Sequence, residues 1–409
     1  MRLRVLLEPH HGATYAQILA LATAAEEGGF DAFFRSDHYL GIEADDTTYE
    51  PTDSWTTLAG LALQTERVRL GTLVNASTFR LPGQLAVEVA TVDQMSGGRA
   101  ELGIGAAWYE REHQYFGIPF PALGERFDRL EEQLAILTGI WDTKPGERFS
   151  FDGKFYQVQD CASIPRWAAR PKIIIGGAGA KRTPTLAARY ADEFNGALGM
   201  DVRERYANFR RICQDVVGRD PAEVRLSATL PVCIGTDAAD LERRKEKLGE
   251  PGARLLAAGV TGTAGDVIAA IENLAAQGAD TVYFHLYGRD DVDHIRLLGS
   301  EVVSRFLSSR GLLRGLCNPG CPHPYPYGPV PHVSRTSPST YASALASMGS
   351  EVSSKFQLVQ RHNAPAAKLV RPDRCRGVMT QAALGMWETS GRAPGACVRA
   401  LKSFMNSVL

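Results

Sequence analysis

Long apolar runs are missing from this sequence. No stretch approaches the eighteen or so uninterrupted apolar residues that a membrane-spanning helix needs. The N-terminal segment reaches Glu8 too early for the apolar core of a secretory signal. From these absences we expect a globular, cytoplasmic protein with no membrane partner.

Cysteine and net charge are also scarce. The seven cysteines follow no regular spacing, and Cys161, Cys213 and Cys233 are predicted to be buried thiols in a reducing compartment. The formal net charge of −1 is unevenly divided, because residues 311–409 carry eleven Lys and Arg against three Asp and Glu, whereas residues 1–310 carry 34 against 43. An acidic main body lacks the clustered positive surface that binds phosphate backbones, so we expect no nucleic-acid partner.

The composition changes near residue 310. Residues 311–409 are Pro-rich, then Ser- and Ala-rich, then basic, without periodicity, which predicts a tail of low order after a folded domain over residues 1–310. Cys317, Cys321 and His323 could ligate a metal, but no fourth ligand follows at a regular spacing. We therefore predict no metal site in the tail.

The main body alternates short β-branched or aromatic runs with longer amphipathic segments. The predicted strands are residues 3–8, 32–36, 68–75, 100–105, 172–176, 193–197, 226–234 and 281–286. Eight strands alternating with helices predict an α/β fold, a (β/α)₈ TIM barrel. A doubly wound open sheet uses the same alternation and is the alternative.

Two segments interrupt the alternation. The first is an insertion after the fourth strand, residues 108–170, in which we predict a long helix over 126–140 and a hairpin over 149–158 beside the barrel mouth. The second, residues 250–263, is rich in Gly and Ala and is predicted to be a loop. It either covers a substrate or is a plain connector.

Active sites of such barrels lie on the loops that follow the carboxyl ends of the strands. Histidines follow three of the predicted strands, which raises the alternative of a metal-dependent hydrolase. His10 and His11 are consecutive, so their side chains would diverge in an extended segment, whereas a chelating pair on one strand needs one residue between its members. The hydrolase is therefore the less favoured alternative.

The fifth predicted strand ends in a glycine-rich turn, residues 176–179, and a helix follows. We predict Thr183 as the N-cap and Pro184 as the first helical residue. The start of a helix attracts anions, and Lys181 or Arg182 would add formal charge. This pattern predicts a phosphate site, although glycines also serve tight turns.

Two other strand ends carry candidate residues. The third strand ends in Val74, Asn75 and Ala76, as a wall or bulge against a planar ring would require, although an ordinary strand end is the alternative. His38 follows the second strand next to Asp37, so it could donate or accept a proton with a pKa tuned by a carboxylate. The alternative for this pair is a loop cap.

Together these motifs resemble the luciferase-like monooxygenase superfamily and, within it, the coenzyme F420-dependent oxidoreductases. The resemblance covers roughly residues 1–308. Its motifs are Ser36-Asp37-His38, residues 68–75 (VRLGTLVN), 97–105 (GGRAELGIG), 106–113 (AAWYEREH), 124–128 (GERFD) and 175–179 (IGGAG), and Arg182-Thr183.

The resemblance implies that F420 is bound without covalent attachment and that His38 moves the proton that accompanies hydride transfer to or from a small organic substrate. It also implies a bulge with a non-prolyl cis peptide within Leu73–Asn75. FMN, with insertion of an oxygen atom, is the alternative, and relatives commonly form homodimers. The residues implied to bind the cofactor are Asp37, Val74, Asn75, Ala76, Gly105, Ala106, Ala107, Tyr109, Gly176, Gly177, Ala178, Arg182 and Thr183.

Overall fold

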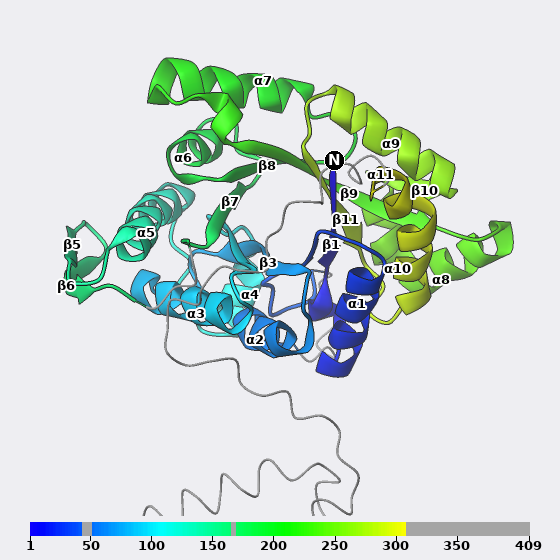
Figure 1. Ribbon diagram of the computed structural model, residues 1–409, viewed down its shortest axis with the longest axis horizontal. Helices are drawn as coiled ribbons and strands as arrows, with labels where there is room; N and C mark the ends of the chain where they lie inside the picture. The colour runs from blue at the N-terminus through cyan, green and yellow to red at the C-terminus, as the bar shows by residue number, and fades with distance from the viewer. Residues whose placement is uncertain (43–50, 165–168, 308–409) are drawn as a thin grey trace, which may run out of the picture. The chain divides into compact units, whose positions relative to one another are not determined.

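A computed structural model describes residues 1–42, 51–164 and 169–307. Within these ranges eight parallel strands form a closed barrel, because β11 pairs with both β9 and β1, and β8 pairs with β9. In spatial order the strands are β1 (Arg2–Leu7), β2 (Ala32–Arg35), β3 (Arg69–Ala76), β4 (Ala100–Gly105), β7 (Lys172–Gly176), β8 (Glu193–Leu198), β9 (Arg225–Ile234) and β11 (Thr281–Leu286). Figure 1 shows the helices arranged around them. The predicted (β/α)₈ barrel is confirmed.

Capping residues and glycines mark the ends of several helices. Thr14 and Gln17 form a capping box at the start of α1, and α3 is followed by Gly97 and Gly98, which both adopt positive φ. The helices are α1 (Tyr15–Glu27), α2 (Ser54–Gln64), α3 (Pro82–Met95), α4 (Glu110–Tyr115), α5 (Leu123–Asp142), α6 (Arg182–Tyr190), α7 (Arg203–Ile212), α8 (Ala238–Leu256), α9 (Ala264–Ala276), α10 (Val292–Leu298) and α11 (Ser304–Leu307). Across the described ranges, none of them combines the length and apolar character that crossing a membrane requires.

Successive side chains of a strand point to opposite faces of the barrel sheet, and this produces two separate apolar cores. Leu3, Val5 and Leu7 of β1 belong to the large core that includes the surrounding helices. A second, small core fills the barrel interior, which we call the apolar plug. Its members are Leu6, Ala32, Phe34, Leu73, Ile174 and Tyr283.

A buried ion network lies on the amino-terminal side of the apolar plug. The Arg4 guanidinium is fully buried and donates to Glu101 Oε2 at 2.6 Å and to the Tyr283 hydroxyl at 2.8 Å. The Tyr283 hydroxyl in turn donates to Glu193 at 2.7 Å. Burial would raise the pKa of Glu101, but Arg4 and Arg69 outweigh it and lower that pKa to about 2. The barrel interior is therefore charged at this end.

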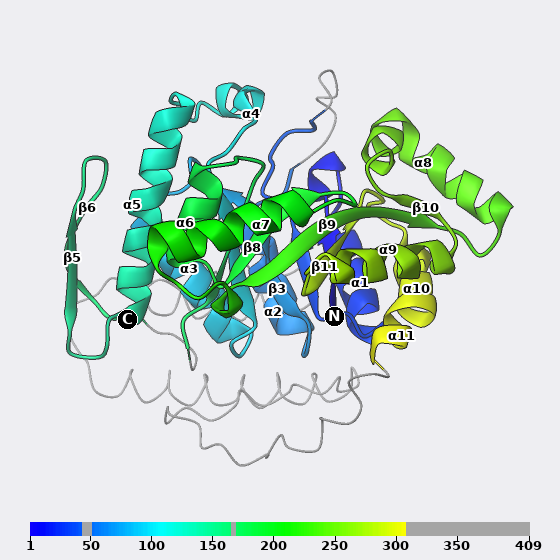
Figure 2. The same ribbon diagram turned by 90° about the horizontal axis from the view of Figure 1, so that it is seen from above.

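The insertion after β4 contains the predicted helix and hairpin. The helix is α5, and the hairpin consists of the antiparallel strands β5 (Arg148–Asp152) and β6 (Gln157–Ala162). Figure 2 shows the hairpin along the outer side of α5, whereas α4 lies at the end of the barrel where the strands finish. Only part of the insertion is thus beside the mouth.

The prediction of a loop over residues 250–263 is wrong. Helix α8 continues to Leu256 through a kink at Gly249, and β10 (Val260–Gly262) pairs in parallel with β9. Alanine favours helices as well as small-residue loops, so composition alone misled the assignment. A lid role has no support from this backbone.

The predictions for the cysteines and the tail have different outcomes. Cys213 and Cys233 are buried as predicted, but Cys161 on the hairpin is only half-buried. The tail, with its candidate ligands Cys317, Cys321 and His323, lies outside the described residues, so its predictions remain untested.

Candidate active site at the barrel mouth

His38 and Glu112 form a hydrogen-bonded pair at the mouth. The Nδ1 atom of His38 lies 3.0 and 3.2 Å from the carboxylate oxygens of Glu112, which is buried in α4. Burial would lower the pKa of His38, but the hydrogen bond and charge of Glu112 outweigh it, so the pKa lies above its usual value. The side chain stays 20% exposed, which leaves it open to a substrate.

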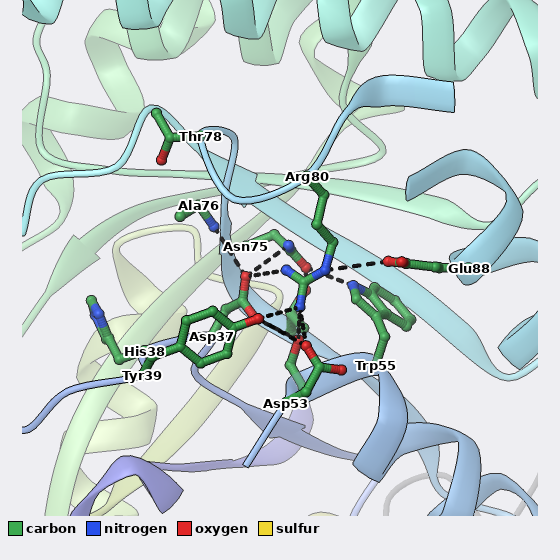
Figure 3. A network of polar contacts seen from close by, with 12 residues as sticks. Asp37, His38, Tyr39, Asp53, Trp55, Asn75, Ala76, Thr78, Arg80 and Glu88 are labelled. Atoms are coloured by element: carbon green, nitrogen blue, oxygen red, sulfur yellow. Dashed lines mark hydrogen bonds and ion pairs between the residues drawn. The ribbon is translucent and has the colours of Figure 1, made fainter. Parts of the chain in front are cut away.

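Asp37 follows β2 as predicted, and its carboxylate is bound within the protein. Its carboxylate is buried and accepts hydrogen bonds from Asn75 Nδ2 at 2.8 Å, Ser54 Oγ at 2.5 Å and Arg80 at 2.7 Å. Arg80 is also paired with Asp53 and Glu88, so one guanidinium joins three carboxylates (Figure 3). Asp37 therefore fixes the end of β3, and the main carboxylate acting on His38 is Glu112.

The end of β3 carries the expected bulge. The peptide bond between Leu73 and Val74 is cis, which confirms what the family resemblance implies. A Cβ added at Gly105 would lie 3.1 Å from the Val74 side chain, and one at Gly176 would lie 3.0 Å from it. Glycine at the ends of β4 and β7 thus gives Val74 the room to project at the mouth.

The start of α6 differs from the prediction. The helix begins at Arg182 with Lys181 at the N-cap position and no side-chain cap, so Thr183 is its second residue and Pro184 its third. The assignment of Thr183 as N-cap is wrong because proline is tolerated throughout the first helical turn, where N–H groups lack helical partners.

The turn before α6 presents open backbone donors. Gly177 has φ +140°, and a Cβ at Gly179 would lie 2.8 Å from the buried Thr183 hydroxyl. Within the described residues the N–H groups of Ala178 and Gly179 have no protein acceptor. Two backbone N–H groups that have no protein acceptor, just before the start of a helix, favour the binding of an anionic group.

Arg182 is already engaged within the protein. Its guanidinium donates to Asp128 at 2.6 Å and to the Gly124 carbonyl at 2.9 Å, and it lies over the Phe127 ring. These contacts tie α6 to α5. Lys181, which is exposed, is therefore the better candidate for meeting an anion.

The loop after β4 forms another side of the mouth. Ala107 has φ +62°, a conformation that residues other than glycine rarely adopt. The Tyr109 hydroxyl donates to the Gly41 carbonyl at 2.8 Å, and Arg126 donates to the Ala106 carbonyl at 3.1 Å. The loops after β2 and β4 are thereby tied together.

A third group of side chains follows β1 and β11. Glu8 accepts from His285 Nε2 at 2.6 Å, and His10 Nδ1 lies 3.1 Å from both Glu8 Oε2 and Ser36 Oγ. Burial lowers the pKa of His10 and so favours its neutral form. Its Nε2 atom is buried without a hydrogen-bond partner in the described structure.

The expectation that His10 and His11 diverge is wrong. Pro9 starts a 3₁₀ turn over Pro9–His11, and the two rings lie 4.1 Å apart between centroids. The described part of the chain nevertheless contains no group of three or more His, Cys, Asp or Glu placed to hold a metal ion.

Four side chains with partners near the mouth were not among the predicted site residues. They are Glu8, Arg80, Glu112 and His285. Glu8, Glu112 and His285 stand in or beside motifs that we considered for other residues, whereas no motif in the sequence includes Arg80. Each of them has a partner far away in the sequence, such as Asp37 for Arg80, 43 residues away, and His285 for Glu8, 277 residues away, and short-range patterns do not report such separations.

The closed barrel and the side chains gathered at the ends of its strands define a (β/α)₈ protein with its functional site at the carboxyl face. The family model for luciferase-like monooxygenase matches residues 1–307. The chain belongs to this family.

Two curated relatives carry names that mention F420. The chain is 36% identical over 186 residues to F420-dependent glucose-6-phosphate dehydrogenase of Microbacterium testaceum, covering 45% of this chain and 53% of that protein. It is 30% identical over 236 residues to F420-dependent hydroxymycolic acid dehydrogenase of Mycobacterium tuberculosis, covering 56% and 63%. The match thus spans only about half the length of the first relative.

Solved structures support the fold. An F420-dependent secondary alcohol dehydrogenase aligns with a TM-score of 0.62 at 17% identity, covering 74% of this chain and 98% of that one. Long-chain alkane monooxygenase LadA aligns with a TM-score of 0.61 at 17% identity, covering 78% and 94%. At this identity the likeness extends to the fold alone.

Proposed function

We propose that the chain is an oxidoreductase that transfers a hydride between coenzyme F420 and a small organic substrate at the barrel mouth. The observation that carries this proposal is the His38–Glu112 pair, a proton donor held at the same end of the barrel as the Val74 bulge and the open donors of Ala178 and Gly179. The F420-dependent names of two relatives support the choice of cofactor.

The residues at the mouth fit a ring with an anionic tail. Val74 would support the ring, and the N–H groups of Ala178 and Gly179 with Lys181 would hold phosphate. The bound cofactor would supply the carbon that gives or takes the hydride. The remaining proposed contacts are Asn75, Ala76, Gly105, Ala106, Ala107, Tyr109, Gly176, Gly177 and Thr183. The side chains of Asp37 and Arg182, which the family resemblance also implied, are bound within the protein.

His38 would handle the accompanying proton. Glu112 holds its Nδ1 side, so the other ring nitrogen is the one to face a substrate oxygen. The raised pKa favours the protonated form, which suits donation during substrate reduction. In the oxidative direction His38 would instead accept the proton.

Glu112→Gln should shift the pH dependence of substrate reduction. Because protonated His38 is required, activity is lost as the pH rises through the His38 pKa. Removing the Glu112 charge lowers that pKa, so the loss should move to lower pH. The measurement is the pH profile of kcat. The matched control is Glu110→Gln, which changes an exposed carboxylate of the same helix, and an unshifted profile for Glu112→Gln would contradict the role of this pair.

Cofactor titration tests the proposed function itself. Fluorescence titration should show F420 binding at micromolar concentration or below, with markedly weaker binding of FMN. Micromolar affinity for FMN with none for F420 would favour the second candidate, an FMN-dependent monooxygenase that inserts an oxygen atom. Pyrimidine monooxygenase RutA of Stutzerimonas stutzeri, 30% identical over 47% of this chain and 53% of that protein, supports that candidate.

We further propose that the chain forms a homodimer and is located in the cytoplasm. Residues 311–409, for which the sequence predicts low order, lie outside the described ranges.

A further inference from the structure

A cavity lies at the amino-terminal end of the barrel, away from the proposed active site. Its volume is about 140 Å³, and its lining includes Leu3 near the start of β1, Arg69 at the start of β3 and Leu307 at the end of α11. Figure 2 shows α11 at the opposite end of the barrel from α4, which lies at the mouth. Barrels of this fold carry out their chemistry at the mouth, so the proposed function gives this cavity no role.

The inner walls of the cavity are apolar and buried. Leu3, Phe30 and Val303 line it and are each 2–3% exposed, whereas Leu307, which also lines it, is 37% exposed. An apolar cavity of about 150 Å³ in another protein holds one benzene molecule. The volume and the apolar walls therefore fit a ligand with a single six-membered ring.

Two arginines add hydrogen-bond donors to the lining. Arg67 donates through Nη2 to the Glu26 carbonyl, and Arg69 donates through Nε to Glu101 and through Nη2 to the Gly98 carbonyl at 3.3 Å. Within the described residues, the other N–H groups of the two guanidinium groups, at Nε and Nη1 of Arg67 and at Nη1 of Arg69, have no acceptor. Guanidinium donors of this kind pair well with a carboxylate.

The acidic groups near these arginines already have partners. Asp31 also lines the cavity, and its Oδ2 atom accepts from Nε of the buried Arg4 at 2.8 Å. The Glu26 carboxylate accepts from the backbone N–H groups of Arg67 and Val68. A ligand carboxylate would therefore meet two guanidinium groups, and the charge of the nearest acid, Asp31, is balanced by Arg4.

We propose that this cavity binds a small aromatic carboxylate with one ring. The ring would pack against Leu3, Phe30 and Val303, and the carboxylate would accept hydrogen bonds from Arg67 and Arg69. Arg69 also pairs with Glu101 of the buried ion network, so the ligand would lie beside that network. Because such a ligand binds only the folded chain, it should stabilise the protein against unfolding. This inference does not depend on the proposed function.

Benzoate, benzyl alcohol and 2-naphthoate are suitable probes for the full chain. Calorimetry should show binding of benzoate, and benzoate should raise the melting temperature. Benzyl alcohol should bind about tenfold more weakly because it lacks the carboxylate. 2-Naphthoate should also bind about tenfold more weakly, because its second ring exceeds the volume of the cavity.

Arg67→Ala should weaken benzoate binding about tenfold, because it removes donors to the carboxylate. Arg67 is exposed, so the variant should fold as the wild type does. The matched control is Arg296→Ala, which removes an exposed arginine from α10 and should leave the benzoate affinity unchanged.

The same titrations can overturn the proposal. It is wrong if benzoate does not bind, if benzyl alcohol or 2-naphthoate binds as tightly as benzoate, or if Arg67→Ala keeps the wild-type affinity. Repeating the benzoate titration in the presence of F420 should give the same affinity. A loss of benzoate binding under these conditions would place benzoate at the mouth and would also overturn the proposal.

Discussion

Replacing His38 by alanine should reduce kcat about 10²- to 10⁴-fold, the range typical for loss of a general acid or base. The variant removes the group that Glu112 holds and whose pKa is raised, while Val74 and the turn before α6 are unchanged. F420 affinity should therefore be retained. Steady-state kinetics measured together with a fluorescence titration separate the two effects.

Chemical rescue sharpens this test. His38→Asn keeps a polar side chain near Glu112 but cannot transfer a proton at neutral pH, so its kcat should fall as far as that of His38→Ala. Added imidazole should restore part of the activity of His38→Ala. If kcat is unaffected in both variants, His38 transfers no proton in the reaction, whereas a wild type that binds F420 without any turnover would favour a cofactor-binding protein without catalysis.

Arg4→Met should lower the free energy of unfolding by about 3–5 kcal/mol, the usual cost of removing one partner of a buried ion pair. Glu101 and Glu193 would remain in the barrel interior with less positive charge to balance them. Urea denaturation followed by circular dichroism measures the loss. Arg203→Met is the control, because Arg203 and Asp201 form an exposed pair, and such pairs contribute about 1 kcal/mol or less.

A second substitution separates charge imbalance from lost packing. Adding Glu101→Leu to Arg4→Met removes a carboxylate left without its main partner, so part of the lost stability should return. If Arg4→Met costs no more than Arg203→Met, the buried network contributes little to folding.

Much of the fold could be predicted because it depends on local patterns. Alternating apolar runs gave the eight barrel strands to within two residues at each end, and a Gly-Gly pair marked the end of α3. Composition was less reliable, since residues 250–263 contain a helix end and a short strand where a loop was expected.

Only the part of the site that depends on the positions of the strand ends could be predicted from the sequence. The position of His38 at the mouth follows from the topology, but its partner Glu112 lies 74 residues away on α4. Asp37 was assigned to the cofactor by family resemblance, and its sequence gives no sign of the partners that bind it. In the structure its carboxylate is bound by Asn75, Ser54 and Arg80.

The apolar plug has a consequence for engineering this protein. Along β1, Arg4 contributes to the buried ion network, Leu6 to the plug, and Glu8 follows at the mouth. The buried ion network and the proposed catalytic residues thus lie at opposite ends of the same barrel. Residues at the mouth, such as Trp108 beside His38, can therefore be varied while the buried ion network at the other end stays intact.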